Sequence, residues 1–581
     1  MSESNSSHDK DLLNRDILIH HVFPLLSPED IKNVSLTNKQ LHEAANSPSV
    51  WHDLYLKTFG ENPLTTHKWP EMYQVRSRSG LFTWGQNGRG KLGLNEAHVP
   101  SDHKTLRGIC RPTQVSGLGS LVVSDISAGG WGFLLLDIEG HVYGIGSISD
   151  RGRAPYVPGR VTNNPNTYPF RNPRGAGLFG GRGPFPFRVG GLIRPDIPPV
   201  TNNDAQPTPP PQPGSRPAPP ATTGMYGGDN SDPQTDAPPL GHGIGPAVPP
   251  RTTAESDAIM TASRDAAQND KKTNEGPSEE DVRKHWLLKF PDDKHPKVVA
   301  ISAGRSRALA LDEENNIWQW DKTFYDQAAR LEFSFGDKRI LKITGGWEKA
   351  AAVVEDVGLV VWDGISLTNV AAVRPVEHET VPNTKLTGDG EIVDVAVGRD
   401  AIVYLDRKGD AYTIDIHKLA SGPVRLDGFM NKLKLSDWKV DAKFTKLTGN
   451  LTHFIFISDR DDVYLTPPDT TLTAGTEPSI IPELQKKGCI SVAAGDRHFL
   501  ALMKGGKILS WGCESQGCGD LGLGQAQELI KNDGASERGM DLVLSKPTQI
   551  RMEGHALAIA AGGWQSAAII TTDDIEHDEK Q

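Results

Sequence analysis

A single pattern recurs along this chain at intervals of roughly 50 residues, and it limits the possible folds more than any other feature. Each copy holds two apolar strands. The first strand follows a turn of small residues, and the second follows a D-x-x-G or acidic turn and ends near an aromatic side chain. The copies begin at Ile126, Ile301, Ile343, Val395, Leu447, Val492 and Ile559. Repeats of this length are typical of β-propellers and solenoids.

A glycine stands in the small-residue turn of every copy. Because glycine alone takes a positive φ at no steric cost, we expect these turns to use left-handed backbone. The glycines are Gly129, Gly304, Gly345, Gly398, Gly449, Gly495 and Gly562.

The seventh copy lacks its second strand, because the residues after "AAIITTDD" are acidic. A matching strand is found near the start of the chain, in "LFTWGQNGRGKLGL" at 81–94. Pairing the two segments would close a ring and remove two exposed sheet edges. The sequence therefore predicts a mainly β fold, a seven-bladed β-propeller closed by pairing of N- and C-terminal strands.

The same opening stretch contains G-x-x-x-x-G-K, the beginning of a phosphate-binding P-loop, at Gly85 to Lys91. A P-loop needs Ser or Thr after the lysine and a helix behind it, but Leu92 follows and no helical pattern begins. A second copy, "WGCESQGCGDLG" at 511–522, keeps the WG and LG pairs without the lysine. We therefore interpret the glycines as turns of a ring-closing strand.

Composition divides the chain into further regions. Its 581 residues are too many for one compact domain, and much of its proline lies in one stretch that includes "PTPPPQPGSRPAPP". That stretch is expected to be disordered with local polyproline II structure, serving as a bare spacer, a docking site for a proline-binding module or a phosphorylated tail. The expected regions are a disordered tail at 1–11, a helical domain at 12–75, the propeller start at 81–147, the insertion at 148–285, the remaining blades at 286–572 and an acidic tail at 573–581.

Charge and cysteine content exclude several classes of protein. The formal net charge of −11 disfavours nucleic acid and membrane surfaces as partners. Four cysteines in so long a chain do not form a disulfide framework, and no His or Cys pair completes a zinc site with Cys513 and Cys518. No apolar run is long enough to span a membrane. We expect a protein of the cytoplasm, the nucleus or both, without metal or cofactor.

The N-terminal region reads as short amphipathic helices. Ser27-Pro28-Glu29-Asp30 is a helix start, and Thr37 begins a T-x-x-Q capping box. Residues 12–54 resemble an F-box through "LSPEDI", "LTNKQLH" and "VW". The resemblance implies a non-catalytic subunit held by the Skp adaptor of a cullin scaffold. The apolar positions expected to bind the adaptor are Leu13, Ile17, Leu18, Val22, Ile31, Leu41 and Trp51.

The repeats resemble the propeller of the regulator of chromosome condensation, through A-G-G-W…D-x-x-G-x-V-Y and W-G-x-N-x-x-G-x-L-G. An F-box before such a propeller is similar to the fungal SCF-associated factors. This combination implies a substrate-recognition subunit of an SCF-type cullin ubiquitin ligase, whose propeller binds an unknown target protein for degradation. The alternative is a guanine-nucleotide exchange or chromatin-binding propeller, which the short neutral N-terminal tail and the acidic total charge disfavour.

The residue two positions after each repeated glycine should emerge on one face of the ring. Aromatic and arginine side chains are the usual anchors of protein interfaces, although packing against neighbouring blades is the other interpretation of the tryptophans. The predicted target-binding face comprises Trp131, Trp347, Asp400, Arg497 and Trp564, with Ser306 and Leu451 at the equivalent positions. His498 is expected to bond the backbone of its turn rather than to act in catalysis. No catalytic residue is predicted.

Overall fold

The computed structural model describes residues 15–148 and 278–572, with gaps at 61–63, 65–67, 292–294, 322, 325, 365–371, 386, 436–441 and 468–470. The predicted tails at 1–11 and 573–581, the larger part of the predicted insertion, and Leu13 lie outside the described residues. No helix within the described ranges is long and apolar enough to cross a membrane.

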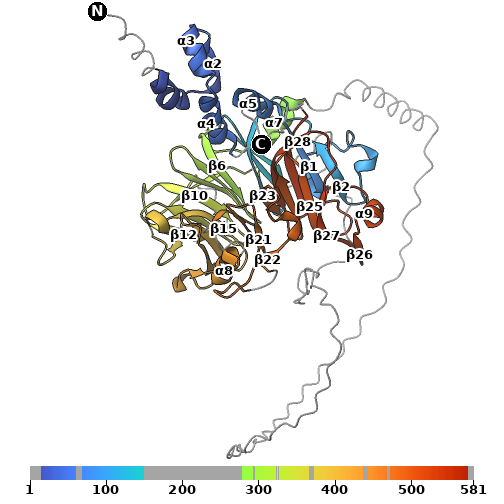
Figure 1. Cartoon of the computed structure of the whole chain (residues 1–581). Coiled ribbons are helices and arrows are strands. Elements are labelled where there is room, and N and C mark those ends of the chain that lie inside the picture. Colours follow the sequence, from blue (N-terminus) through green and yellow to red (C-terminus); the bar gives the residue numbers. More distant parts are fainter. Residues whose placement is uncertain are drawn as a thin grey trace, which may run out of the picture. The chain divides into compact units, whose positions relative to one another are not determined.

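The N-terminal residues form a small helical domain (Figure 1). Its elements are η1 (Leu18–Val22), η2 (Phe23–Leu25), α2 (Pro28–Ser35), α3 (Lys39–Ala45), α4 (Pro48–Phe59) and α5 (Trp69–Arg78). Ser27 caps α2 as predicted, because its hydroxyl accepts the Asp30 amide at 3.1 Å. The cap of α3 is Asn38 and not Thr37, since the Asn38 side chain accepts the Leu41 amide at 2.9 Å. The start of α3 was therefore predicted one residue too early.

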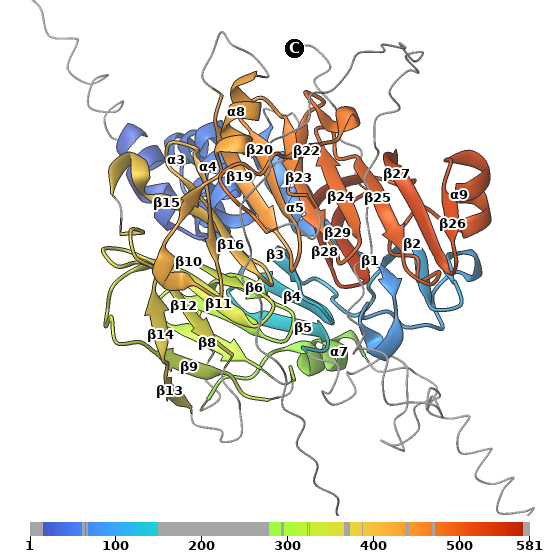
Figure 2. The ribbon, with the colours of Figure 1, turned by 90° about the horizontal axis from the view of Figure 1, so that it is seen from below.

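Most of the remaining described chain folds into seven sheets, the blades of a propeller, which are antiparallel except where β13 pairs with β9. Figure 2 shows them following one another around a ring in chain order. The first three blades comprise β3 (Val123–Ala128), β4 (Gly132–Asp137) and β5 (Val142–Gly146) in blade 1; β6 (Val298–Ala303), β7 (Ala308–Asp312), β8 (Ile317–Trp320), β9 (Ala329–Glu332) and the parallel β13 (Val373–Pro375) in blade 2; and β10 (Ile340–Gly345), β11 (Lys349–Val354), β12 (Gly358–Asp363) and β14 (His378–Thr380) in blade 3.

In the remaining four blades, as in the first three, the strands are given in order from the propeller axis outward. They comprise β15 (Ile392–Val397), β16 (Ala401–Asp406), β17 (Ala411–Asp415) and β18 (Val424–Arg425) in blade 4; β19 (Phe444–Gly449), β20 (Phe454–Ser458), β21 (Val463–Leu465) and β22 (Ser479–Ile480) in blade 5; β23 (Cys489–Ala494), β24 (His498–Met503), β25 (Ile508–Glu514), β27 (Asp541–Gln549) and β26 (Ser536–Arg538) in blade 6; and β28 (His555–Gly562), β29 (Gln565–Thr571), β1 (Gly80–Gln86) and β2 (Gly108–Gln114) in blade 7. Helices α8 (Asp427–Leu435) and α9 (Ala526–Asn532) lie in connections.

The predicted ring closure is confirmed. Strand β1 pairs with β29 in antiparallel register from Gly80 opposite Ile570 to Gly85 opposite Gln565. Trp84 on this strand is completely buried, and its indole N–H donates to the carbonyl of Asp520 at 3.1 Å. Gly85 has φ +103°, so it is one of the glycines that does need left-handed backbone.

The repeated turn glycines do not behave as predicted. None of the seven has a positive φ. They are required by close packing instead: a Cβ on Gly304 would lie 2.5 Å from the carbonyl oxygen of Gly346 in the next blade, and one on Gly562 would lie 2.5 Å from that of Gly129. Glycine is therefore retained where the turns of neighbouring blades touch.

Helix α7 (Glu279–Trp286) lies within the region that was predicted to be a disordered insertion. Its Ser278 hydroxyl caps the first turn, and Val282 and Trp286 are buried in the core of the closing blade. Leu287 then forms an isolated bridge with Tyr143 of β5. The folded chain therefore resumes earlier than the sequence predicts and completes the outer edge of blade 1.

Candidate functional surfaces

The two ends of the propeller form two distinct surfaces. We define the inner-turn face by the turns that join the innermost strand of each blade to the second strand, at 129–131, 304–307, 345–348, 398–400, 449–453, 495–497 and 562–564. We define the helical-domain face by the opposite ends of those innermost strands, where α5 leads into β1. The six residues of β3 separate the two faces by about 20 Å.

The predicted target-binding residues all lie on the inner-turn face. Trp131, Asp400, Arg497 and Trp564 occupy equivalent positions in their turns, whereas the strand register places Trp347 one residue earlier, so the prediction of one common position is wrong for Trp347. Trp131, Trp347, Arg497 and Trp564 are half-buried, and Asp400 is exposed. The tryptophans therefore both pack against the turns and leave part of each ring on the surface. Ser306 and Leu451 are also half-buried.

A belt of hydrogen bonds joins these turns. The amides of Gly130 and Arg305 donate to carbonyls of the following blade, at 3.3 and 3.0 Å. Further links run from Arg399 to Leu451, from Asn450 to Gly495, from Asp496 to Gly563 and from the Gln565 side chain to Gly129. The belt crosses six of the seven junctions in the described chain, so the face is rigid where the side chains emerge.

Cations are stacked on two of the tryptophans. The Arg305 guanidinium lies 3.6 Å from the centre of the Trp347 ring, and the Arg399 guanidinium lies 6.0 Å from it. The Lys91 ammonium lies 4.5 Å from the ring of Trp131. Each contact combines cation–π attraction with a fixed orientation of the ring. The structure thus gives Lys91 a packing role at the turn, and no helix follows it.

Charged groups on this face are paired with one another. Arg497 donates to the carboxylate of Asp541 at 2.7 Å, and Arg399 donates to Asp400 at 2.7 Å. Burial raises the pKa of the Asp496 carboxyl, against the opposing effect of Arg305, Lys91 and Arg497 nearby. A protein that binds this face through these charged side chains would have to replace their ion pairs with contacts of its own.

A hollow of about 290 Å³ opens between blades 4 and 5 on the same face. Leu451, Phe454 and Leu472 line it, and Asp400 and His417 stand among the polar groups of its wall. Asp400 stands here at the position where blades 1 and 7 have tryptophan, and Leu451 stands at the position where blade 3 has Trp347. The smaller side chains leave the space open.

The predicted adaptor-binding residues divide into two groups. Ile31 is completely buried in the core of the helical domain, and Trp51 packs on Tyr73 while its N–H donates to Ala45 at 2.8 Å. Ile31 therefore presents no surface to a partner, whereas Trp51 packs against the core and stays partly exposed. Leu18 and Leu41 are half-buried, whereas Ile17 and Val22 are exposed.

Two leucines that the sequence analysis missed are more exposed than any predicted adaptor-binding residue that the structure describes. Leu25 and Leu36 expose 80% and 75% of their surface. Together with Ile17 and Val22 they give the helical domain an unpartnered apolar surface, which is the expected property of a protein-binding site. The helical spacing of the apolar residues was the signal that could have pointed to these two leucines. That spacing shows which residues share a face of a helix, but not which face the domain buries.

The helical domain packs directly on the propeller. Leu557 of β28 is buried in the core of the helical domain, and the buried Arg76 donates to the carbonyl of Ser124 on β3 at 3.4 Å. Burial lowers the pKa of Arg76 to about 10, and its guanidinium lies 4.7 Å from the ring of Phe59. Both contacts are on the helical-domain face, at blades 7 and 1.

A buried polar network connects blades 6 and 7. His498 bonds the hydroxyl of Ser566 at 2.7 Å and lies 3.4 Å from the carboxyl of Asp520, so the prediction of a backbone partner is wrong. Ser, His and Asp do meet here, but all three are completely buried or nearly so and reach no surface. Burial lowers the pKa of His498 to about 3 and raises that of Asp520 well above the usual range. The network is structural.

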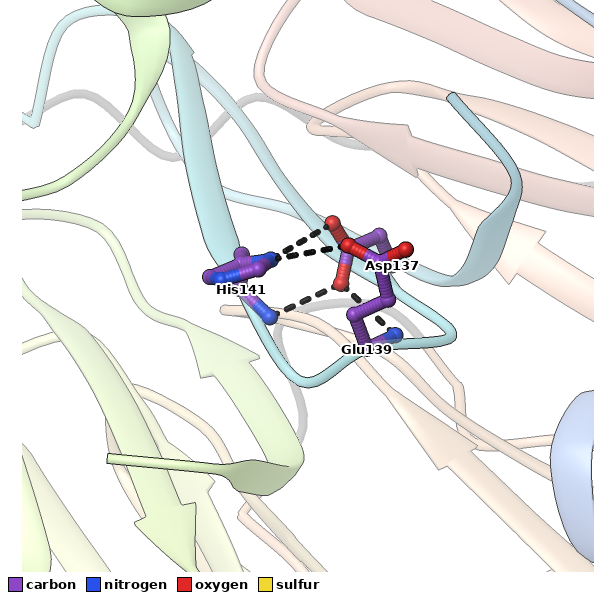
Figure 3. A group of neighbouring side chains, drawn as sticks. All are labelled: Asp137, Glu139 and His141. Atoms are coloured by element: carbon purple, nitrogen blue, oxygen red, sulfur yellow. Dashed lines mark hydrogen bonds and ion pairs between the residues drawn. The ribbon is translucent and has the colours of Figure 1, made fainter. Parts of the chain in front are cut away.

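Asp137, Glu139 and His141 gather at the hairpin between β4 and β5 (Figure 3). Their ligand atoms are close enough for a metal ion, but the same carboxylate geometry recurs without histidine. Asp137 accepts the amide four residues later at 2.8 Å and the hydroxyl of Tyr143, six residues later, at 3.2 Å. Asp312 with Trp318 and Asp406 with Tyr412 repeat both bonds. We therefore interpret the group as part of a hydrogen-bond pattern that stabilises the hairpins of several blades.

Comparisons with known proteins agree with this architecture. Residues 16–57 match the F-box-like family, and residues 79–136 and 489–518 match the regulator of chromosome condensation (RCC1) repeat. The chain thus combines an F-box-like domain with a seven-bladed propeller that carries RCC1 repeats.

Two fungal proteins are similar to this chain in sequence. The chain is 27% identical to SCF-associated factor 1 of Saccharomyces cerevisiae, over 95% of this chain and 96% of that protein. It is 28% identical to F-box protein pof9 of Schizosaccharomyces pombe, over 48% of this chain and 59% of that protein. Among solved structures, Prp20p of Saccharomyces cerevisiae aligns with a TM-score of 0.47 at 13% identity, covering 88% of this chain and 97% of that one.

Proposed function

We propose that this protein is the substrate-recognition subunit of an SCF-type cullin ubiquitin ligase. The F-box-like domain binds a Skp-type adaptor, and the propeller binds a target protein for ubiquitination and proteasomal degradation. One observation carries the proposal: the helical domain, with its exposed apolar residues, contacts the propeller at the face opposite the tryptophan-bearing turns. A bridging subunit needs two such separate surfaces.

The adaptor contact is assigned to Ile17, Val22, Leu25 and Leu36. These side chains are exposed and apolar, and they lie in the segment that matches the F-box-like family. Leu18 and Leu41 are half-buried and complete the contact at its edge. Ile31 and Trp51 support the surface from within.

The target contact is assigned to the inner-turn face. Trp347 between Arg305 and Arg399, Trp131 with Lys91, and the neighbouring hollow supply aromatic, cationic and concave features in one region. Rigid aromatic and arginine side chains are the usual energetic centres of protein interfaces. The cytoplasm, the nucleus or both remains our expectation for where the protein acts.

The test is binding of purified full-length protein to a purified Skp adaptor. Replacing Leu25 and Leu36 by Ala together should weaken binding by about 2–4 kcal/mol, because two exposed anchors are lost. The matched control replaces Leu106, which is also exposed but belongs to a loop before β2. Equal affinity of the Leu25/Leu36 variant and the wild type would refute the adaptor contact.

A further inference from the structure

The innermost strand of every blade carries a β-bulge at the same place. In each blade the pairing with the second strand skips one residue near the start of the innermost strand. A bulge leaves its extra residue unpaired and turns the side chain out of the sheet. The skipped residues are Ser124, Val299, Leu341, Val393, Thr445, Ile490 and Leu557.

These bulge residues lie on the helical-domain face. Leu557 shows their direction, because it is buried in the core of the helical domain. The backbone of Ser124 also meets the helical domain, since Arg76 of α5 donates to its carbonyl. The helical domain therefore contacts two adjacent members of this ring of seven bulge residues.

Three further members are apolar and are left exposed by the helical domain. Val299, Leu341 and Val393, in consecutive blades 2, 3 and 4, expose 53%, 37% and 45% of their surface. We call these three residues the bulge arc. The arc continues the surface on which the helical domain already rests.

The charged side chains beside the bulge arc form ion pairs with one another. Lys297 pairs with Glu313 at 3.2 Å and Lys338 with Asp356 at 3.0 Å. Lys342 pairs with Asp394, and Arg407 with Glu391. The net charge of these pairs is zero, so the surroundings favour an apolar contact over a strongly charged one.

We infer that the bulge arc is a second contact for the partner that binds the F-box-like domain, and that it receives an apolar segment of that partner. The inference rests on the proposed function. Its basis is continuity: the arc shares a face with the helical domain, and Leu557 belongs to both the ring of bulge residues and the domain's core. Two apolar surfaces on the same side of one rigid body can be covered by a single partner, and joint engagement raises affinity.

The experiment measures binding of the full-length protein to a purified Skp adaptor by calorimetry. The variant carries Val299→Ser, Leu341→Ser and Val393→Ser. Serine is compatible with the bulge, because Ser124 occupies the same position in blade 1. The matched control carries Leu106→Ser and Met540→Ser, two exposed apolar residues at the inner-turn ends of blades 7 and 6. Thermal unfolding confirms that each variant is folded.

The arc variant should bind the adaptor about tenfold more weakly than the wild type and the control, because three aliphatic side chains no longer contribute to the contact. Unchanged affinity of the arc variant would overturn the inference. The Leu25→Ala/Leu36→Ala variant tests the proposed function separately, and its loss of binding would stand even then. Sedimentation of the wild type checks the other occupant: a concentration-dependent dimer that the arc variant abolishes would assign the arc to a second copy and overturn the inference.

Discussion

The two faces of the propeller differ in how far their side chains are already occupied. On the inner-turn face, Trp347 holds Arg305, Arg497 holds Asp541, and the backbone belt joins the turns. On the other side, Leu25, Leu36 and the bulge arc expose aliphatic surface without such internal partners in the described chain. Exposed aliphatic surface favours lasting association, whereas a polar, internally paired surface exchanges partners more easily. The comparison is what we expect if the proposed adaptor contact lies on one side and the proposed target contact on the other.

The largest effect is expected from opening the ring, which would destroy both faces at once. Ending the chain at Leu557 removes β29 and leaves β1 without the strand that buries Trp84. Losing the burial of one blade costs an amount comparable to the whole stability of a domain, about 5–15 kcal/mol. The truncated protein should aggregate or melt far below the wild type in thermal unfolding. Ending the chain at Thr572 is the control. A cooperative transition at the wild-type temperature in the protein that ends at Leu557 would contradict closure.

A smaller effect should come from the buried acids beneath the inner-turn face. Burial raises the pKa values of both Glu514 and Asp520, so the folded protein binds more protons than the unfolded chain above the ordinary carboxyl range. The stability they confer is complete below those ordinary pKa values and is lost as the pH rises through the raised ones. For each group the loss is about 1.4 kcal/mol for every pH unit that separates its unfolded and folded pKa values.

Glu514→Gln should therefore raise the melting temperature at neutral pH and flatten its fall between about pH 5 and 8. The measurement is thermal unfolding across this range, with exposed Glu537→Gln as the matched control. A variant that melts with the same pH dependence as the wild type would show that Glu514 is ionised in the folded protein.

The pairing on the inner-turn face predicts a measurable coupling. A double-mutant cycle of Arg305→Ala and Trp347→Ala should give an interaction energy of about 1 kcal/mol in urea unfolding. The same cycle with Arg399, whose guanidinium lies farther from the ring, should give less. Equal coupling for the two arginines would mean that distance to the ring does not decide the contact.

The smallest effect is expected for Lys91→Ala. The ammonium donates to the Gln86 side chain at 2.6 Å and lies over Trp131, so its loss should cost about 1 kcal/mol or less. ATP or GTP should not change the melting temperature of either protein. A nucleotide-dependent shift in the wild type that Lys91→Ala abolishes would restore the P-loop interpretation.

Much of the fold could be predicted because each blade repeats the same local information. The strand pairs, the D-x-x-G hairpins and the recurrence of WG and LG indicated the blades, and the incomplete seventh copy indicated the closing strand. The role of the repeated glycines could not be found in this way. Their constraint comes from the carbonyls of a neighbouring blade, such as that of Gly346 beside Gly304, and a single copy contains no trace of it.

Sites were harder to predict than blades, since the sequence does not show which apolar face a small domain keeps for itself. Ile31 and Leu36 both belong to the apolar pattern around α2, yet one is in the core and the other on the surface. Helix α7 was missed because its few apolar residues follow a long polar stretch. Arg305 could have been found, because Gly-Arg recurs at Gly304-Arg305 and Gly398-Arg399, on either side of the blade that carries Trp347.

The hydrogen-bond belt on the inner-turn face determines which neighbouring blades separate most easily. Where a turn amide donates to the next blade, its exchange with solvent deuterium requires those blades to separate. The junction between blades 3 and 4 lacks such a backbone bond within the described chain. It is held by side-chain contacts: Lys342 pairs with Asp394, Arg399 lies over Trp347, and Val397 packs against Gly346. Side-chain contacts of this kind yield more readily than backbone bonds. The turn amides of blade 3, none of which donates to blade 4 in the described chain, should therefore exchange before the turn amides that donate across the other junctions, and the ring should open first between blades 3 and 4.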